Sequence, residues 1–171
     1  MWRTVYQTFI RPLLGRPPHF QAAALCYRSG ASAEPEILII TSLETRRWIL
    51  PKGWPKAGYD AGGVALEEAW EEAGIKPAGG PPRHVGDYIY DKRLSGGAPM
   101  RTRVKVFAIE VPHLLEHYPE EGMRERRWVS LEEAAEAVDE ASLKELLRTL
   151  PADTFRSAAP GRAAGNQDPD A

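Results

Sequence analysis

The chain has 171 residues, which is enough for one domain with a full hydrophobic core but short for two. Its formal charge is −2, so no global basic field argues for duplex nucleic acid as a partner. No apolar stretch approaches the roughly 20 residues that span a bilayer, so we expect no membrane partner either.

Residues 1–20 form a predicted N-terminal arm. They carry Arg3, Arg11 and Arg16 and no acidic residue, but they lack the continuous apolar core and cleavage site of a signal peptide. We expect this arm to pack on the domain through its large apolar side chains, with a transit peptide as the alternative.

A single domain is expected over residues 21–150. Apolar runs bounded by turn residues predict strands at residues 21–28, 36–41, 47–50, 85–90, 103–111 and 126–129. The only cysteine, Cys26, lies in the run AAALCY, which favours a buried thiol in a reducing compartment; we expect the cytoplasm. Helical spacing appears at residues 131–138 and 142–150. Residues 151–171 have almost no large apolar side chain and are expected to be a disordered tail.

A glycine-rich loop followed by a predicted helix lies near the middle of the chain. Residues 52–63 read KGWPKAGYDAGG, a segment too rich in glycine and proline for a helix or strand, and long loops of this kind are often functional. Asp60 can cap the helix that follows, and Gly74 suits the left-handed residue that ends it.

This helix carries four glutamates on one face, Glu67, Glu68, Glu71 and Glu72. The opposite face, expected to pack on the core, consists of Ala65, Leu66, Ala69, Trp70 and Ala73. Like charges four residues apart cost only about 0.2–0.5 kcal/mol per pair, so a solvated acidic face is one interpretation. The other is a site for Mg²⁺ or Mn²⁺, which prefer oxygen ligands.

The stretch GWPKAGYDAGGVALEEAWEEAGI resembles the signature of the Nudix hydrolases, G-x5-E-x7-R-E-U-x-E-E-x-G-U, where U is aliphatic. Gly53 matches the first glycine, Glu68 the glutamate after the arginine, and Glu71 and Glu72 the final pair. Gly74, Ile75 and Ala69 also match. Two positions depart: Tyr59 replaces the first glutamate, and Glu67 replaces the arginine.

The resemblance implies an α/β fold, an α/β/α sandwich around a mixed sheet. It also implies that Mg²⁺, with Mn²⁺ possible, is held by the carboxylates of Glu68, Glu71 and Glu72 and by the Gly53 carbonyl. Glu72 is our first choice for the general base, and Glu120 or Glu121 the second. In the family the two departing positions brace the loop; here the Tyr59 hydroxyl could donate to Glu67, or Lys56 could pair with it. Because the metal-binding glutamates remain, we expect an active enzyme.

The flanking stretches resemble one branch of the family, the diphosphoinositol polyphosphate phosphohydrolases, which also cleave diadenosine polyphosphates. They are QAAALCYRS, ILIITSLETRRWILPKG, RTRVKVFAIEV and RERRWVSLEEAAEAV. The LPKG stretch also resembles diadenosine tetraphosphate hydrolases, so the two substrates stay open. A polyphosphorylated small molecule needs cationic ligands. Matching to the inositol branch indicates phosphate contacts at Arg28, Ser42, Arg47, Arg101, Arg124 and Arg126. Lys52 and Lys56 could stabilise the leaving phosphate. Ordinary solvated charge is the alternative for each.

Other interpretations remain open. A degenerate domain could bind a nucleotide or inositol phosphate as a sensor, and a cap-removing enzyme would act on RNA ends. The segment HLLEH, residues 113–117, matches a zinc peptidase pattern, but flanking prolines favour a surface turn. Trp48, Trp70 and Trp128 are expected in the core, whereas Trp54 in the glycine-rich loop could touch substrate.

Overall fold

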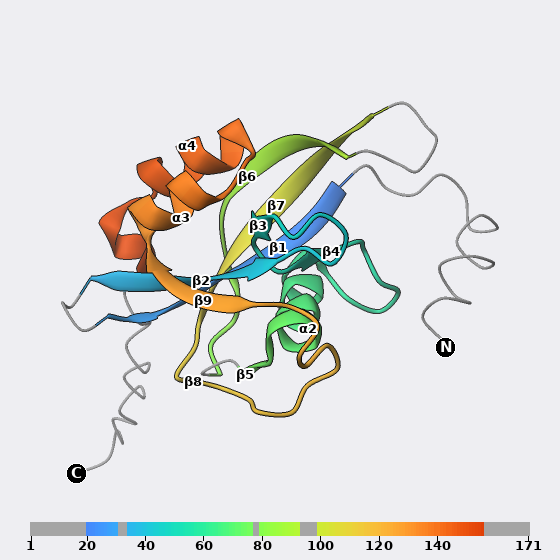
Figure 1. The fold of residues 1–171 in the computed structure, drawn as a ribbon, viewed down its shortest axis with the longest axis vertical. Coiled ribbons are helices and arrows are strands. Elements are labelled where there is room, and N and C mark those ends of the chain that lie inside the picture. The colour runs from blue at the N-terminus through green and yellow to red at the C-terminus, as the bar shows by residue number, and fades with distance from the viewer. Residues whose placement is uncertain (1–19, 31–33, 77–78, 93–98, 156–171) are drawn as a thin grey trace, which may run out of the picture.

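The computed structural model describes residues 20–30, 34–76, 79–92 and 99–155. A mixed sheet forms the middle layer, with helix α2 (Ala61–Ala73) on one face and helices α3 (Leu131–Ala137) and α4 (Ala141–Thr149) on the other (Figure 1). This arrangement confirms the expected α/β/α sandwich. The N-terminal arm lies outside the described residues except for Phe20.

The main sheet is built around β1. Its bounds and those of its partners are β1 (Phe20–Ser29), β2 (Pro35–Thr41), β3 (Trp48–Ile49), β4 (Lys52–Gly53), β6 (Arg83–Lys92), β7 (Met100–Glu110) and β9 (Arg126–Ser130). The strand order is β3-β2-β1-β7-β6, with β4 paired to β1 and β9 to β2. β1 runs parallel to β7 and antiparallel to β2 and β4, so the sheet is mixed as predicted.

Successive side chains of β1 point to opposite faces of the sheet and so belong to two separate hydrophobic cores. Ala23, Leu25 and Tyr27 face the layer of α3 and α4, while Ala22, Ala24 and Cys26 face α2. Cys26 is fully buried, as its apolar surroundings predict. Because strands buried on both faces read as continuous apolar runs, β1 could be recognised from AAALCY.

Helix α2 begins and ends where the sequence indicates. The Asp60 side chain accepts a hydrogen bond from the Gly63 amide at 2.7 Å, and Gly74 ends the helix with φ at 66°. A Cβ atom at Gly74 would lie 2.6 Å from the Tyr118 ring, so glycine is needed there for space as well as for backbone conformation.

The expected burial of α2 is partly wrong. Trp70, assigned to the core, is 41% exposed, whereas Glu68 and Glu72 are only 4% and 6% exposed. The two glutamates are covered by other parts of the chain: Glu68 lies against Gly53 of β4, and Glu72 accepts from the Lys52 amide and from Arg124. Arg124 belongs to the segment after β8 (His113–Leu114), which runs along the end of the helix. There the Glu120 amide donates to the Glu71 carbonyl at 3.1 Å. Trp48 and Trp128 do pack against the cores, although both remain half-buried.

Two further segments differ from expectation. The HLLEH segment forms neither a helix nor a simple turn, because β8 pairs with β5 (Ile75–Lys76) in a small second sheet. The chain also stays ordered past residue 150, in the 3-10 helix Ala152–Phe155, where the Phe155 ring meets the Tyr27 ring edge-on at 5.2 Å. The predicted tail is therefore ordered over these four residues, and residues 156–171 lie outside the described residues.

The loop between α3 and α4 is fastened at both ends across the sheet. Val138 forms a backbone bridge with Trp48, and the Ser142 hydroxyl accepts from the Ile89 amide at 2.9 Å and donates to the Ile89 carbonyl at 2.6 Å. Asp139 and Glu140 lie between these fixed points. Among the described residues, no helix has the length and apolar character needed to cross a membrane.

Candidate active site

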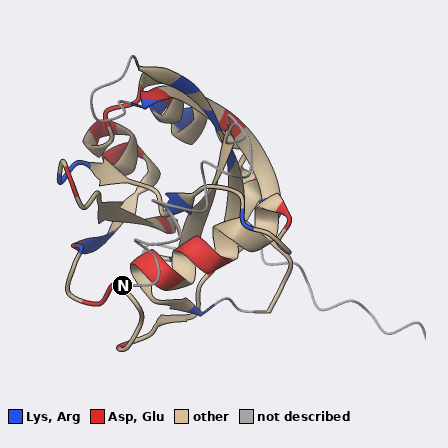
Figure 2. Cartoon of the chain, turned by 90° about the vertical axis from the view of Figure 1, so that its right-hand side faces the viewer, with Lys and Arg blue, Asp and Glu red and all other residues tan. Residues whose placement is uncertain are grey.

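Helix α2 brings its buried carboxylates against the short strand β4. Gly53 pairs with Ala22 in the sheet, and a Cβ atom placed on Gly53 would lie 2.2 Å from the Glu68 carboxylate. Only glycine therefore lets the backbone approach this carboxylate. The acidic residues form two bands along the helix (Figure 2).

Lys56 lies between two of the predicted metal ligands. Its Nζ atom is 2.9 Å from Glu68 Oε1 and 3.2 Å from Glu71 Oε1. Burial lowers the pKa of Lys56, but its hydrogen bonds and ion pairs with Glu68 and Glu71 outweigh this effect and raise it. Lys56 thus pairs with the ligand carboxylates rather than with Glu67, and the Tyr59 side chain is exposed.

Glu72 belongs to a buried charge network. Its Oε1 atom accepts from Arg124 Nη2 at 2.6 Å, and its Oε2 atom accepts from the Lys52 amide at 3.0 Å. Arg124 also donates to Glu120 at 2.6 Å and to the Thr41 carbonyl at 3.0 Å. Burial raises the pKa of Glu72 to about 7, against the opposing effect of Arg124. Arg124 therefore holds Glu72 in a fixed orientation.

The donor set suits a hard divalent cation. Carboxylates of Glu68, Glu71 and Glu72 with a backbone carbonyl are the oxygen ligands that Mg²⁺ accepts. In the described part of the chain, however, no three acidic, histidine or cysteine side chains are already grouped tightly enough to hold a metal ion. The contacts explain this, since an ammonium separates Glu68 from Glu71 and a guanidinium holds Glu72. A metal would have to take over these interactions.

Lys52 points to the other face of the sheet from the glutamates. Its Nζ atom lies 5.8 Å from the centre of the Tyr90 ring. Burial lowers the pKa of Lys52, and the charges of Glu72 and Glu140 oppose that shift. Lys52 thus links the glutamate cluster electrostatically to the loop between α3 and α4.

The other cations predicted to bind phosphate are more dispersed. Arg28 pairs with Glu36 at 2.8 Å and stacks on Trp128. Along β1, Arg28 lies six residues, or roughly 20 Å, from Ala22, which pairs with Gly53. Arg126 donates to the Ala73 carbonyl at 2.9 Å, at the end of α2.

Ser42 Oγ lies 2.7 Å from Thr45 Oγ1. Arg101 is exposed on β7 opposite Asp91. Trp54 lies beneath the Lys92 ammonium, 4.8 Å from its ring centre. Of the cations predicted to contact substrate, the side chains of Lys56 and Arg124 thus contact the glutamates, and Lys52 contacts Glu72 through its backbone amide. Arg28 and Arg126 lie toward other parts of the sheet and helix.

The second choices for the general base differ in setting. Glu120 is buried against Arg124, and Glu121 is exposed beside His117 at 3.1 Å. Glu120 is therefore engaged with the same guanidinium that holds Glu72.

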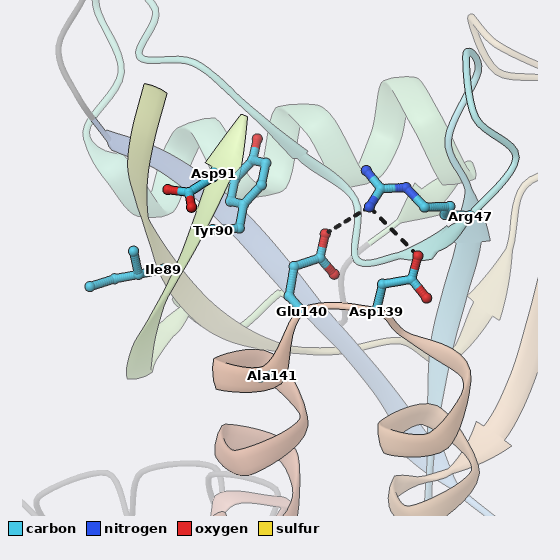
Figure 3. A pocket seen from close by; sticks show the side chains of 7 residues that line it. All are labelled: Arg47, Ile89, Tyr90, Asp91, Asp139, Glu140 and Ala141. Atoms are coloured by element: carbon cyan, nitrogen blue, oxygen red, sulfur yellow. Dashed lines mark ion pairs between the residues drawn. The ribbon is translucent and has the colours of Figure 1, made fainter. Parts of the chain in front are cut away.

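A cavity of about 250 Å³ opens beside Lys52 on this side of the sheet. It is lined by Arg47, Ile89, Tyr90, Asp91, Asp139, Glu140 and Ala141 (Figure 3). The sequence singled out only Arg47 among them. Asp139 and Glu140 directly precede a predicted helix, where acidic residues are typical of a helix start. No local pattern indicates that they approach Arg47, which lies 92 and 93 positions earlier.

Comparisons with known proteins agree with this architecture. The family model of the NUDIX domain matches residues 19–150. The human protein diphosphoinositol polyphosphate phosphohydrolase 3-beta is 32% identical over 117 residues, which cover 67% of this chain and 65% of the relative. The match thus spans slightly less than two thirds of that relative's length.

Solved structures share the fold. An Ap4A hydrolase from C. elegans, in a binary complex, superposes with a TM-score of 0.58 at 25% identity, over 75% of this chain and 92% of that chain. The NUDIX domain of Shewanella oneidensis NrtR, complexed with ADP ribose, superposes with a TM-score of 0.57 at 13% identity. The superposition covers 86% of this chain and 97% of that chain. With the family model matching most of the chain, this protein belongs to the Nudix domain family.

Proposed function

We propose that this protein is a Mg²⁺-dependent Nudix pyrophosphohydrolase that cleaves a phosphoanhydride bond in a dinucleoside polyphosphate or a diphosphoinositol polyphosphate. The observation that carries the proposal is the group of Glu68, Glu71 and Glu72 against Gly53, flanked by cationic side chains. The names of the similar proteins, a diphosphoinositol polyphosphate phosphohydrolase and an Ap4A hydrolase, support the substrate class. The buried single cysteine suits a reducing compartment such as the cytoplasm.

The cation would be held by the three glutamates and the Gly53 carbonyl, with Mn²⁺ as a possible substitute for Mg²⁺. When bound, it would neutralise phosphate charge and lower the pKa of a water molecule.

Glu72 would accept the proton of the attacking water. In the metal-free protein burial raises the pKa of Glu72 to about 7, and a base works best when its pKa lies near the working pH. Arg124 and the Lys52 amide hold one carboxylate oxygen each, which fixes the direction in which Glu72 can take a proton.

The lysines supply positive charge where phosphate oxygens would lie. Lys56 is half-buried and pairs with two carboxylates, so a cation bound there would release its ammonium toward the substrate. Lys52 offers a second ammonium from the opposite face of the sheet. Such fixed charges stabilise the extra negative charge that develops on a leaving phosphate.

The test is hydrolysis of a panel of diphosphate-containing substrates with Mg²⁺ or Mn²⁺. Glu71→Gln and Glu72→Gln should each lower kcat at least a hundredfold. Glu67→Gln, on the same helix but outside the metal-binding set, is the matched control and should stay within a few fold. Absence of phosphate release by the unaltered protein over the whole panel would refute the proposal.

One observation favours a second candidate, a sensor that binds a nucleotide or inositol phosphate without turning it over. Lys56 pairs with both Glu68 and Glu71 without any metal, and Tyr59 and Glu67 depart from the family signature. A sensor should bind its ligand in the presence of a chelator and release no phosphate on prolonged incubation. Loss of binding on chelation would speak against it.

A further inference from the structure

The cavity beside Lys52 has walls from three parts of the chain. Tyr90 and Asp91 come from β6, Arg47 precedes β3, and Glu140 belongs to the loop between α3 and α4. Figure 3 shows Arg47 above the acidic pair Asp139 and Glu140, with Tyr90 and Asp91 across the opening. Its volume, about 250 Å³, lies just below the roughly 300–1,000 Å³ of sites for whole drug-sized ligands. The cavity therefore suits a single base or a single sugar-sized ring rather than a complete dinucleotide.

The charge of the lining opposes a phosphorylated ring. Three acids face one arginine among the lining residues, a formal balance of −2. The arginine is already engaged, since Arg47 Nη1 lies 3.6 Å from Asp139 Oδ2 and 3.9 Å from Glu140 Oε1. An inositol ring carrying phosphates would place its negative charges beside these acids, and like charges in contact weaken binding strongly.

Glu140 gives the cavity a buried hydrogen-bond acceptor. Its side chain is only 9% exposed, and its Oε2 atom is buried and makes no hydrogen bond with any described residue. Although Glu140 occupies the capping position of α4, its side chain does not cap the helix. Buried polar atoms normally have partners, so this carboxylate is suited to a ligand that brings N–H donors.

Two flat groups complete the wall. The Tyr90 hydroxyl donates to Gln21 Oε1 at 2.6 Å, which fixes its ring. The planar Arg47 guanidinium stacks readily on aromatic rings. Flat surfaces beside a buried acceptor match an aromatic base with an amino group better than a puckered polyol.

We propose that this cavity binds the amino-bearing purine base of a dinucleoside polyphosphate, with Glu140 as acceptor, and that its acidic lining disfavours diphosphoinositol polyphosphates. The proposal rests on the hydrolase function proposed above and narrows its substrate. Lys52 lies between the cavity and the glutamate cluster: its Nζ atom is 5.8 Å from the centre of the Tyr90 ring, which lines the cavity, and its amide donates to Glu72 at 3.0 Å. A polyphosphate chain could therefore run from a base in the cavity toward the glutamates, past the Lys52 ammonium.

The test compares kcat/KM with Mg²⁺ for diadenosine tetraphosphate, a diphosphoinositol polyphosphate and inorganic tetraphosphate, which has no base. The dinucleotide should exceed the other two at least tenfold. Glu140→Gln should lower kcat/KM for the dinucleotide about tenfold by raising KM. It should change kcat/KM for inorganic tetraphosphate less than twofold. Glu145→Gln, which removes the same charge from the exposed side of α4, is the matched control and should change neither.

A charge reversal provides a second arm. Glu140→Lys should lower kcat/KM for the dinucleotide further and raise kcat/KM for the inositol substrate. Thermal melting of each variant shows whether it is folded. An inositol substrate cleaved as well as the dinucleotide by the unaltered protein, or an unchanged KM in folded Glu140→Gln, would overturn the proposal.

Binding separates this proposal from the hydrolase function. If no anhydride is cleaved, the hydrolase function fails, but calorimetry with adenosine and guanosine 5′-monophosphates still tests the cavity. Binding that is at least tenfold tighter than that of uridine 5′-monophosphate, and weakened about tenfold by Glu140→Gln, would retain the cavity as a purine site. Equal binding of all three nucleotides would reject it.

Discussion

Replacing Lys56 with methionine should tighten divalent-cation binding. The Lys56 ammonium lies 2.9 Å from Glu68 and 3.2 Å from Glu71, so a cation between these carboxylates must displace it. A hydrogen bond to a charged group contributes about 1.5–3 kcal/mol. Because Lys56 is 30% exposed and water can solvate it on release, we take that range for the displacement as a whole. At about 1.4 kcal/mol per tenfold, the affinity should rise roughly ten- to hundredfold.

The assay is calorimetric titration of the metal-free chain with Mg²⁺ and Mn²⁺. Lys76→Met, an exposed lysine in β5, is the matched control and should leave both affinities unchanged. Without metal, Lys56→Met should also lower the free energy of unfolding, because the buried Glu68 and the partly buried Glu71 lose their counter-ion. Unchanged or weaker metal binding in Lys56→Met would show that the ammonium does not compete with the cation.

Three further predictions follow from the same contacts. Gly53→Ala should lower the free energy of unfolding by about 1–3 kcal/mol in urea titrations, because the new Cβ would lie 2.2 Å from the Glu68 carboxylate; unaltered stability would contradict this reading. Arg124→Gln should lower the free energy of unfolding by about 3–5 kcal/mol, since it removes the guanidinium that pairs with two buried carboxylates. Arg103→Gln, at an exposed ion pair, should cost below about 1 kcal/mol, and equal losses in the two variants would refute the argument. In the metal-free protein, folded Glu72 keeps its proton up to about pH 7, whereas the unfolded side chain releases it near pH 4.5. The folded state therefore binds more protons between these values, so the free energy of unfolding should fall as the pH rises from 4.5 to 7. The fall should reach up to about 3 kcal/mol in the metal-free protein and disappear in Glu72→Gln; a slope that persists would assign it to another group.

Local signals predicted the elements of the fold well. Asp60 and Gly74 mark the ends of α2 because capping and left-handed backbone depend on the residue itself and its near neighbours. The run around Cys26 predicted β1 because a strand covered on both faces must be apolar throughout. The family signature then predicted that this helix carries the candidate site.

Features made by distant contacts could not be predicted in this way. The helical pattern assigned Trp70 to the core and left the acidic face either solvated or metal-binding, because it cannot show that Gly53 covers Glu68 and that Arg124 covers Glu72. Arg124 reaches Glu72 across 52 positions, so its structural role in a buried network is invisible locally. Glu140 and Arg47 meet only because the loop between α3 and α4 crosses the sheet.

The hydroxyl of Ser142 has a consequence for association between molecules. β6 is the last strand in the sheet order, so one side of its backbone has no neighbouring strand among the described residues. Exposed strand edges invite pairing with a second chain and hence aggregation. By donating to the Ile89 carbonyl and accepting from its amide, Ser142 occupies both backbone groups that an incoming strand would need there. The contact that anchors one wall of the cavity therefore also protects the sheet against edge-to-edge growth.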